Sequence, residues 1–217
     1  MEKEILFDLD DTLMDTKKLS RLLYEDISKT TGIDIKEIIR LKDEYKLGLE
    51  CHTDYYPDDL LAYIHEKTGK RIEPSQNPFN KKSIFKEALY VETIETLREL
   101  RGFYNLGTLT EGHNDYQFNK MSFSGIINFI DPKLIYIARR KLSNEVLDRI
   151  PDGTTVVDND REVVKKLHNT NKGKRLNIFL LEKDISESEK VEGIEIIESL
   201  TTFAKIIPRG RARNILS

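Results

Sequence analysis

The sequence predicts an α/β fold: a doubly wound parallel sheet with an inserted, all-helical cap domain. Beyond residue 90, short apolar runs alternate with amphipathic segments. Strands that alternate with helices form parallel sheets covered on both faces. Between residues 15 and 89, by contrast, the apolar spacing is helical throughout and no strand pattern is convincing. The helical stretch therefore interrupts the chain just after its first strand.

That first strand ends in a cluster of acids. An apolar run at residues 5–7 is followed directly by Asp8, Asp10 and Asp11. Ionised carboxylates are costly to bury without partners, so this pattern does not suit a hydrophobic core. One interpretation is an ordinary acidic turn, because Asp is a common turn former. The other is a reactive metal site at the end of a buried strand.

The helical stretch contains three amphipathic segments. Leu19, Leu22, Leu23 and Ile27 share one face of the first segment, which ends at Gly32. The second runs over residues 35–48. The third opens at Pro57 and ends near Gly69, and residues 71–80 are rich in proline and polar side chains, which indicates a loop or hinge.

The second part of the chain alternates between the two kinds of element. We expect helices at residues 91–100, 116–123, 143–150, 162–167 and 200–207, and strands at 104–110, 126–130, 134–137, 154–157 and 176–181. In parallel sheets, ligands bind beyond the carboxyl ends of the strands. Asp8, Thr110 and Asp158 each stand at such an end, so we expect their side chains to converge.

Composition excludes several classes of function. The chain has 217 residues, 38% of them hydrophobic and 34% charged, as in a globular protein. A formal net charge of −3 gives no general electrostatic basis for binding nucleic acid or an anionic membrane. No apolar segment approaches the roughly 20 residues that span a bilayer. Cys51 is the single cysteine, and Met1 leads straight into the first strand without a signal peptide, so we expect a cytoplasmic protein.

The strand-end residues suit phosphoryl transfer. A carboxylate can attack phosphorus and form an aspartyl-phosphate, provided that positive charge and hydrogen-bond donors stabilise the phosphoryl oxygens. Mg²⁺ is a hard, oxygen-liganded cation, and Asp8 and Asp158 are candidate ligands together with the backbone carbonyl of Asp10. The Thr110 hydroxyl is a candidate donor. Asp10 is placed to protonate a leaving alkoxide and later to activate water.

Four segments together resemble the motifs of the haloacid dehalogenase (HAD) superfamily. Residues 8–13, Asp-Leu-Asp-Asp-Thr-Leu, are similar to the first motif, Asp-x-Asp-x-Thr after a strand. Residues 106–110 resemble the second motif, an apolar strand that ends in Ser or Thr. Lys141 is the counterpart of the third-motif lysine, and Val156-Val157-Asp158-Asn159-Asp160 resembles the acidic fourth motif.

The resemblance implies a Rossmann-like core at residues 1–14 and 90–217, with a helical, C1-type cap at residues 15–89. It implies that Asp8 is the nucleophile, that Asp10 is the general acid/base, and that Asp8, Asp10 and Asp158 bind Mg²⁺. Family members that cleave carbon–halogen bonds typically lack the second aspartate. The expected activity is therefore hydrolysis of a small phosphorylated metabolite by a monomer or homodimer.

Several alternatives stay open at this point. Arg140 or Lys133 is the alternative to Lys141, because the usual Lys-Pro pair is missing. Where relatives carry a second acid in the fourth motif, this chain has Asn159 and Glu162, so that role falls to Glu162, Asp160 or neither. A phosphomutase would use the same nucleophile. The alternative from a different class is a non-catalytic, phospholigand-binding or regulatory protein.

Two further segments have simpler interpretations. Cys51, His52 and Asp54 cluster, but no second ligand pair follows at a zinc-site spacing. We expect a loop that opens the next helix, with aromatic side chains lining the substrate opening. The arginines of residues 209–213 resemble an RNA-binding tail, but they lack an aromatic platform, so we expect a solvated tail.

Overall fold

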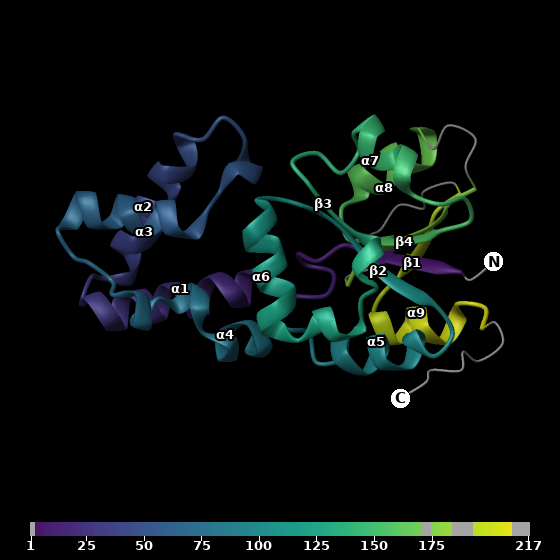
Figure 1. Cartoon of the computed structure of the whole chain (residues 1–217), viewed down its shortest axis with the longest axis horizontal. Helices are drawn as coiled ribbons and strands as arrows, with labels where there is room; N and C mark the ends of the chain where they lie inside the picture. The colour runs from purple at the N-terminus through teal and green to yellow at the C-terminus, as the bar shows by residue number, and fades with distance from the viewer. Residues whose placement is uncertain (1–2, 171–174, 184–192, 210–217) are drawn as a thin grey trace.

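The computed structural model describes residues 3–170, 175–183 and 193–209. Its centre is a six-stranded sheet in the order β3-β2-β1-β4-β5-β6, with every neighbouring pair parallel (Figure 1). The strands are β1 (Glu4–Phe7), β2 (Asn105–Glu111), β3 (Ile135–Ala138), β4 (Thr155–Asp158), β5 (Asn177–Leu181) and β6 (Glu195–Ile197). The order runs outward in both directions from β1, which defines a doubly wound sheet. The predicted fold class is confirmed.

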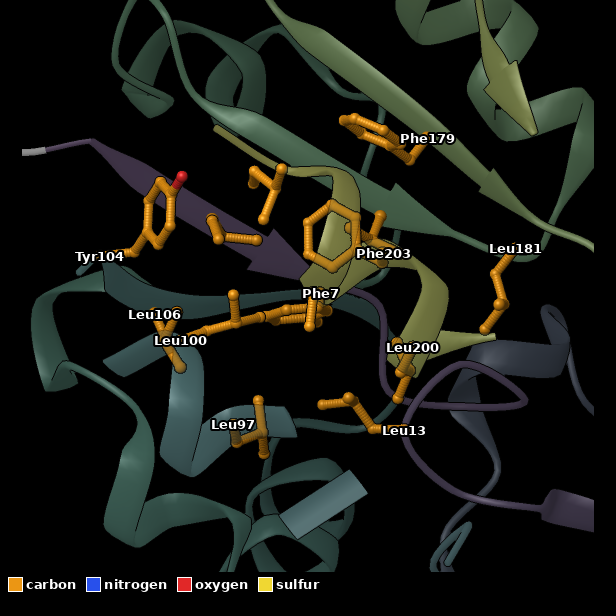
Figure 2. Packing of buried hydrophobic residues seen from close by; sticks show 14 of the residues in the cluster. Phe7, Leu13, Leu97, Leu100, Tyr104, Leu106, Phe179, Leu181, Leu200 and Phe203 are labelled. Atoms are coloured by element: carbon orange, nitrogen blue, oxygen red, sulfur yellow. The ribbon is translucent and has the colours of Figure 1, made fainter. Parts of the chain in front are cut away.

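Helices cover both faces of this sheet. They are α5 (Thr93–Arg101), α6 (Asn114–Ser124), α7 (Asn144–Arg149), α8 (Arg161–Thr170) and α9 (Leu200–Ile206). Helices α5 and α9 lie on one face, and α7 and α8 lie on the other (Figure 1). The side chains of each pair of helices pack against the strands of that face. Successive residues of a strand point to opposite faces, so Phe7 enters the first cluster and Leu6 the second. On the first face, the rings of Phe7 and Phe203 meet edge to face with centroids 5.8 Å apart (Figure 2).

The helical cap lies at one end of the molecule, next to α6 (Figure 1). It contains α1 (Thr16–Thr31), α2 (Ile35–Leu47), α3 (Pro57–Thr68) and α4 (Lys82–Glu87), with short 3-10 turns between α2 and α3 and between α3 and α4. These helices bury their own hydrophobic cluster, to which Met14 and, from α6, Tyr116 also belong. The cap therefore has a core of its own that continues onto α6. We retain residues 15–89 as the proposed extent of this domain.

The helix boundaries in the cap follow the signals in the sequence. The Asp15 side chain accepts a hydrogen bond from the backbone N–H of Lys18 at 2.8 Å, which caps the first turn of α1. Gly32 ends this helix with a φ of 73°, a left-handed conformation that favours glycine. Pro57 opens α3, where its missing N–H leaves no helical hydrogen bond unmade.

Four details differ from the sequence-based expectations. Residues 126–130 are not a strand: Ile126–Phe129 is a 3-10 turn, because Gly125 ends α6 with a φ of 90° and redirects the chain. Val91 is 99% exposed, so it does not belong to the buried face of α5. The short elements α4 and β6 were not predicted, since six and three residues are too few to establish a period.

Residues 210–213 of the arginine-rich tail lie outside the described residues. Within the described ranges, no helix is both long enough and apolar enough to cross a membrane.

Candidate active site

The carboxyl ends of β1 and β4 bring two aspartates together. The backbone N–H of Asp8 donates to the carbonyl oxygen of Val157 at 2.9 Å, which continues the pairing of β1 with β4. Asp8 and Asp158 therefore leave adjacent strands at the same edge of the sheet, as the sequence predicted. Both residues are buried.

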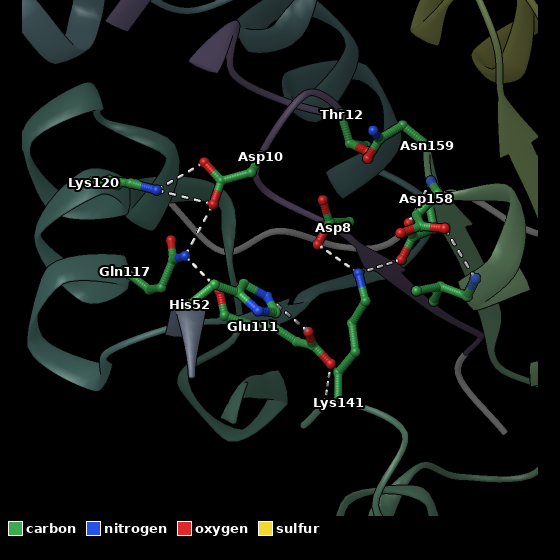
Figure 3. A network of polar contacts seen from close by, with 12 residues as sticks. Asp8, Asp10, Thr12, His52, Glu111, Gln117, Lys120, Lys141, Asp158 and Asn159 are labelled. Carbon is green, nitrogen blue, oxygen red and sulfur yellow. Dashed lines mark hydrogen bonds and ion pairs between the residues drawn. The ribbon is translucent and has the colours of Figure 1, made fainter. Parts of the chain in front are cut away.

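Lys141 lies between these two carboxylates (Figure 3). Its Nζ is 2.9 Å from Asp8 Oδ1 and 2.6 Å from Asp158 Oδ2. Its backbone N–H donates to Glu111 Oε1 at 2.8 Å, so the end of β2 holds the loop that presents Lys141. Arg140 and Lys133 are exposed. The geometry thus assigns the cation of this cluster to Lys141.

Charge in this buried cluster is not balanced, since one ammonium faces two carboxylates. Burial raises the pKa of Asp8 to about 8; the Lys141 charge opposes this shift, while Asp158 and Asp10 add to it. Burial also raises the pKa of Asp158. Burial acts to lower the pKa of Lys141, but the charges of Asp8 and Asp158 outweigh it, and the net pKa is raised. Clusters of perturbed carboxylates are typical of catalytic and metal sites.

Asp10 turns away from this cluster toward α6 (Figure 3). Lys120 Nζ is 2.7 Å and 2.9 Å from its two carboxylate oxygens, and Gln117 Nε2 donates to Asp10 Oδ2 at 2.9 Å. Gln117 approaches closely because residue 112 is glycine: a Cβ there would lie 2.6 Å from Gln117 Nε2, and the φ of Gly112 is 142°. Lys120 and Gln117 are site residues that sequence reasoning missed. The sequence signal for them is their spacing of three positions on the helix predicted after β2, because this spacing places both side chains on the same face of the helix.

Hydrogen bonds within the segment that follows β1, and one to the residue that follows β4, stabilise the turn after β1. Asp11 has a φ of 58°, and its Oδ1 accepts from the backbone N–H and the hydroxyl of Thr16, with the backbone contact at 3.0 Å. Thr12 Oγ1 donates to Asn159 Oδ1 at 3.1 Å. Asp11 is therefore structural and holds the turn.

Thr110 stands at the carboxyl end of β2, which is the neighbour of β1. Its residue is 1% exposed, and no described residue forms a hydrogen bond with its Oγ1. A buried hydroxyl without a partner is unusual in a folded protein. This donor fits the predicted role of Thr110 in holding an anion, which stays a prediction.

The other acidic residues of the fourth motif do not reach the cluster. Asp160 Oδ1 accepts the backbone N–H groups of Glu162 and Val163 at 2.8 Å and 3.1 Å, which caps α8. The Glu162 side chain is exposed and pairs with Lys165 at 3.3 Å. Of the alternatives that the sequence left open, the structure favours neither residue as a second acid.

A cavity of about 220 Å³ lies between the cap and the core beside α6, and Asp10 lies in its wall. The cap contributes residues of α1 and of the short turn η1 (His52–Asp54), followed by Tyr55; the core contributes residues of α6 and the preceding loop. Ion pairs join the cap to the core nearby. Arg139 Nη2 is 2.5 Å from Asp54 Oδ2 and 3.2 Å from Glu50 Oε2, and His52 Nε2 is 4.0 Å from Glu111 Oε2. As expected, the 51–56 segment opens α3 and places an aromatic side chain at the cavity.

The donor set at the strand ends fits a hard cation. Asp8 and Asp158 offer carboxylate oxygens, and Mg²⁺ prefers oxygen ligands together with water and substrate phosphate. Within the described ranges, no three His, Cys, Asp or Glu side chains converge on one point, so a metal here would depend on such additional ligands. A divalent cation bound here would replace the proton that the raised pKa of Asp8 keeps on this carboxyl group, and would neutralise the carboxylates of Asp8 and Asp158 together with Lys141.

No protein-family model matches this chain, and no curated protein matches its sequence. A haloacid dehalogenase-like hydrolase from Burkholderia xenovorans superposes with a TM-score of 0.68 at 16% identity, over 95% of this chain and 96% of that one. The HAD-hydrolase YfnB from Bacillus subtilis, bound to magnesium, gives 0.58 at 18%, over 94% and 98%. A HAD phosphatase from Thermococcus onnurineus gives 0.55 at 19%, over 96% and 99%.

These likenesses establish that the chain has the HAD-like hydrolase fold with its helical cap. They do not select a reaction. L-2-haloacid dehalogenases match as well, at 12% identity. A choice between phosphate esters and carbon–halogen bonds therefore depends on the residues of this chain.

Proposed function

We propose that this protein is a magnesium-dependent phosphatase of the HAD branch with a C1-type cap, which hydrolyses a small phosphomonoester. The observation that carries the proposal is Asp10, whose carboxylate lines the cavity two positions after the buried Asp8. A halide leaves as a stable anion and needs no acid, whereas an alkoxide must be protonated. A second aspartate at this place has a task only in the phosphate reaction.

Each residue then has a defined role. An Asp8 carboxylate oxygen attacks phosphorus, the bond from phosphorus to the leaving oxygen breaks, and Asp10 gives that oxygen a proton. Asp10 next takes a proton from a water molecule that attacks the aspartyl-phosphate, which releases phosphate and restores Asp8. Lys141 and Thr110 stabilise the phosphoryl oxygens. Mg²⁺ bound by Asp8, Asp158 and the Asp10 carbonyl would supply further positive charge.

The cap would separate this chemistry from bulk water. Closure over the cavity strengthens electrostatic interactions inside it, and opening admits substrate and releases product. Arg139 and His52 lie at the contacts that join the two parts in the arrangement observed.

The direct test is hydrolysis of an aryl phosphate with and without Mg²⁺, by wild type and by Asp8→Asn. We expect activity that requires Mg²⁺ and is lost in Asp8→Asn, with Asp160→Asn as a matched control that keeps activity. Activity that survives in Asp8→Asn would remove Asp8 as nucleophile. An inactive wild type that also fails to bind beryllofluoride with Mg²⁺ would favour a non-catalytic protein instead.

A further inference from the structure

Gln117, in the wall of the cavity beside Asp10, carries a buried acceptor that the phosphate chemistry does not use. Gln117 lines the cavity and is 4% exposed. Its Nε2 donates to two acceptors, Asp10 Oδ2 and the Glu111 carbonyl, which fixes the orientation of the amide. The other atom is therefore the oxygen Oε1, and no described residue donates to it. A hydroxyl or amino group of a ligand would satisfy this acceptor.

The cap wall of the same cavity contributes a cation. Lys46, near the end of α2, has its Nζ 5.3 Å from the centroid of the Tyr55 ring, and both residues line the cavity. Lys120, the other lysine in the wall, is paired with Asp10. Among the described residues, no carboxylate forms an ion pair with Lys46. Burial and the charge of Lys42 lower the pKa of Lys46, so a ligand anion would relieve an unfavourable environment.

The size of the cavity limits the ligand. Its volume of about 220 Å³ lies below the roughly 300–1,000 Å³ of pockets that hold drug-sized ligands. Tyrosine rings form part of the wall, namely Tyr24, Tyr55 and Tyr116. A leaving group of a few carbon atoms fits this space better than a nucleoside does.

We propose that this cavity binds the leaving group of the substrate, and that the leaving group is a small dihydroxy acid, of which one hydroxyl oxygen carries the phosphate and the other hydroxyl is free. A hydroxyl of that group donates to Gln117 Oε1, and its carboxylate pairs with Lys46 at the cap. The inference rests on the proposed phosphatase function, because it names the substrate class of the same site. The amide of Gln117 would thus accept a hydrogen bond from the substrate through Oε1 and donate one to Asp10 through Nε2.

Binding to Asp8→Asn in the presence of Mg²⁺, measured by calorimetry, tests the inference without turnover. Three probes differ by one group each: 3-phosphoglycerate has both the hydroxyl and the carboxylate, glycerol 3-phosphate lacks the carboxylate, and the phosphate ester of 3-hydroxypropanoate lacks the hydroxyl. We expect 3-phosphoglycerate to bind at least about fivefold more tightly than each of the other two probes. A factor of this size corresponds to the free energy that one partly exposed ion pair or one hydrogen bond contributes. Adding Lys46→Ala should remove the preference over glycerol 3-phosphate. Adding Lys36→Ala, an exposed lysine on the same helix, should preserve it.

The outcomes separate this inference from the proposed function. Equal affinities for the three probes, or no binding at millimolar concentration, would overturn the inference even if the wild type hydrolyses aryl phosphate with Mg²⁺. If Lys36→Ala also abolishes the preference for 3-phosphoglycerate over glycerol 3-phosphate, Lys46 is not the residue that causes this preference. If the three affinities have the expected order but the wild type hydrolyses none of the probes, the inferred ligand class is supported and the proposed phosphatase activity is contradicted.

Discussion

The ammonium of Lys141 lies 2.9 Å from Asp8 Oδ1, although 133 positions separate the two residues in the chain. Both side chains are buried, and Asp158 completes the cluster at the end of the neighbouring strand. In the proposed reaction the phosphate of the substrate enters next to these carboxyl groups, and Lys141 provides one cation that stays in place. Such a cluster is costly for the fold, which is why a functional explanation is needed.

Replacing Lys141 should harm both stability and activity. Lys141→Met leaves two buried carboxylates without their cation, so we expect the free energy of unfolding to fall by about 3 kcal/mol without metal. The loss of a charge on the phosphoryl oxygens should lower kcat at least about 100-fold. Urea unfolding in EDTA and aryl phosphate hydrolysis measure these effects. Lys133→Met, on an exposed residue, should change neither; equal effects in both variants would contradict the role given to Lys141.

The metal-free protein should become less stable as the pH rises. The pKa of Asp8 is raised from its ordinary 3.8 to about 8, so between these values the folded state binds a proton that the unfolded state has released. Stability therefore falls as the pH increases through this window, since the unfolded state binds fewer protons than the folded state does. Unfolding in EDTA at pH 5 and pH 8 measures the trend. Asp8→Asn should reduce the slope, and an unchanged slope would show that Asp8 is not its source.

Magnesium should stabilise the protein through Asp158. A cation that binds only the folded state raises the melting temperature with concentration, and Mg²⁺ also relieves repulsion between Asp8 and Asp158. Thermal unfolding with increasing Mg²⁺ should show this rise in wild type but not in Asp158→Asn. Asp160→Asn is the control, because Asn retains the cap of α8. If the increase in melting temperature with Mg²⁺ is lost in Asp160→Asn and kept in Asp158→Asn, the metal binds at Asp160 and not at Asp158.

Lys120 should act on the reaction by positioning Asp10. In Lys120→Met both oxygens of Asp10 lose a donor, so the carboxylate is held only by Gln117 and kcat should fall about tenfold or more with little change in KM. Lys120→Arg, which keeps the charge, should recover part of the rate. The pH dependence of kcat should shift in Lys120→Met, since the charge next to the acid/base is lost. A purely structural role would leave that profile in place.

Gly107 should tolerate no side chain. A Cβ there would lie 2.5 Å from Leu134 Cβ and 2.5 Å from Leu6 Cδ2, in the middle of β2. Gly107→Ala should therefore lower the free energy of unfolding by about 1–3 kcal/mol through overpacking. Gly102→Ala is the matched control, because the nearest atom to its Cβ would be 3.4 Å away. Equal stability of the two variants would mean that β2 and its neighbours adjust at little cost.

Sequence determined much of the fold because its signals are local. Apolar spacing and caps located α1, α2 and α3, and the alternation beyond residue 90 predicted a parallel sheet, whose carboxyl ends lie at one edge by geometry alone. The sequence therefore predicts that Asp8, Thr110 and Asp158 lie at one edge of the sheet. Elements of three to six residues, such as β6 and α4, left too few positions for the same argument.

Only the tertiary structure decided which side chains meet. Lys141, Arg140 and Lys133 are equivalent cations in the sequence, and packing of the loop against Glu111 turned the first toward Asp8 while the others stay exposed. Lys120 reaches Asp10 for the same reason: the direction of α6 is set by contacts with the cap and the sheet, across more than a hundred positions. Periodicity depends on neighbours a few residues apart, whereas the pairing of buried charges depends on how whole elements pack. The sequence therefore determined the class of site, and the tertiary structure determined which side chains contact its aspartates.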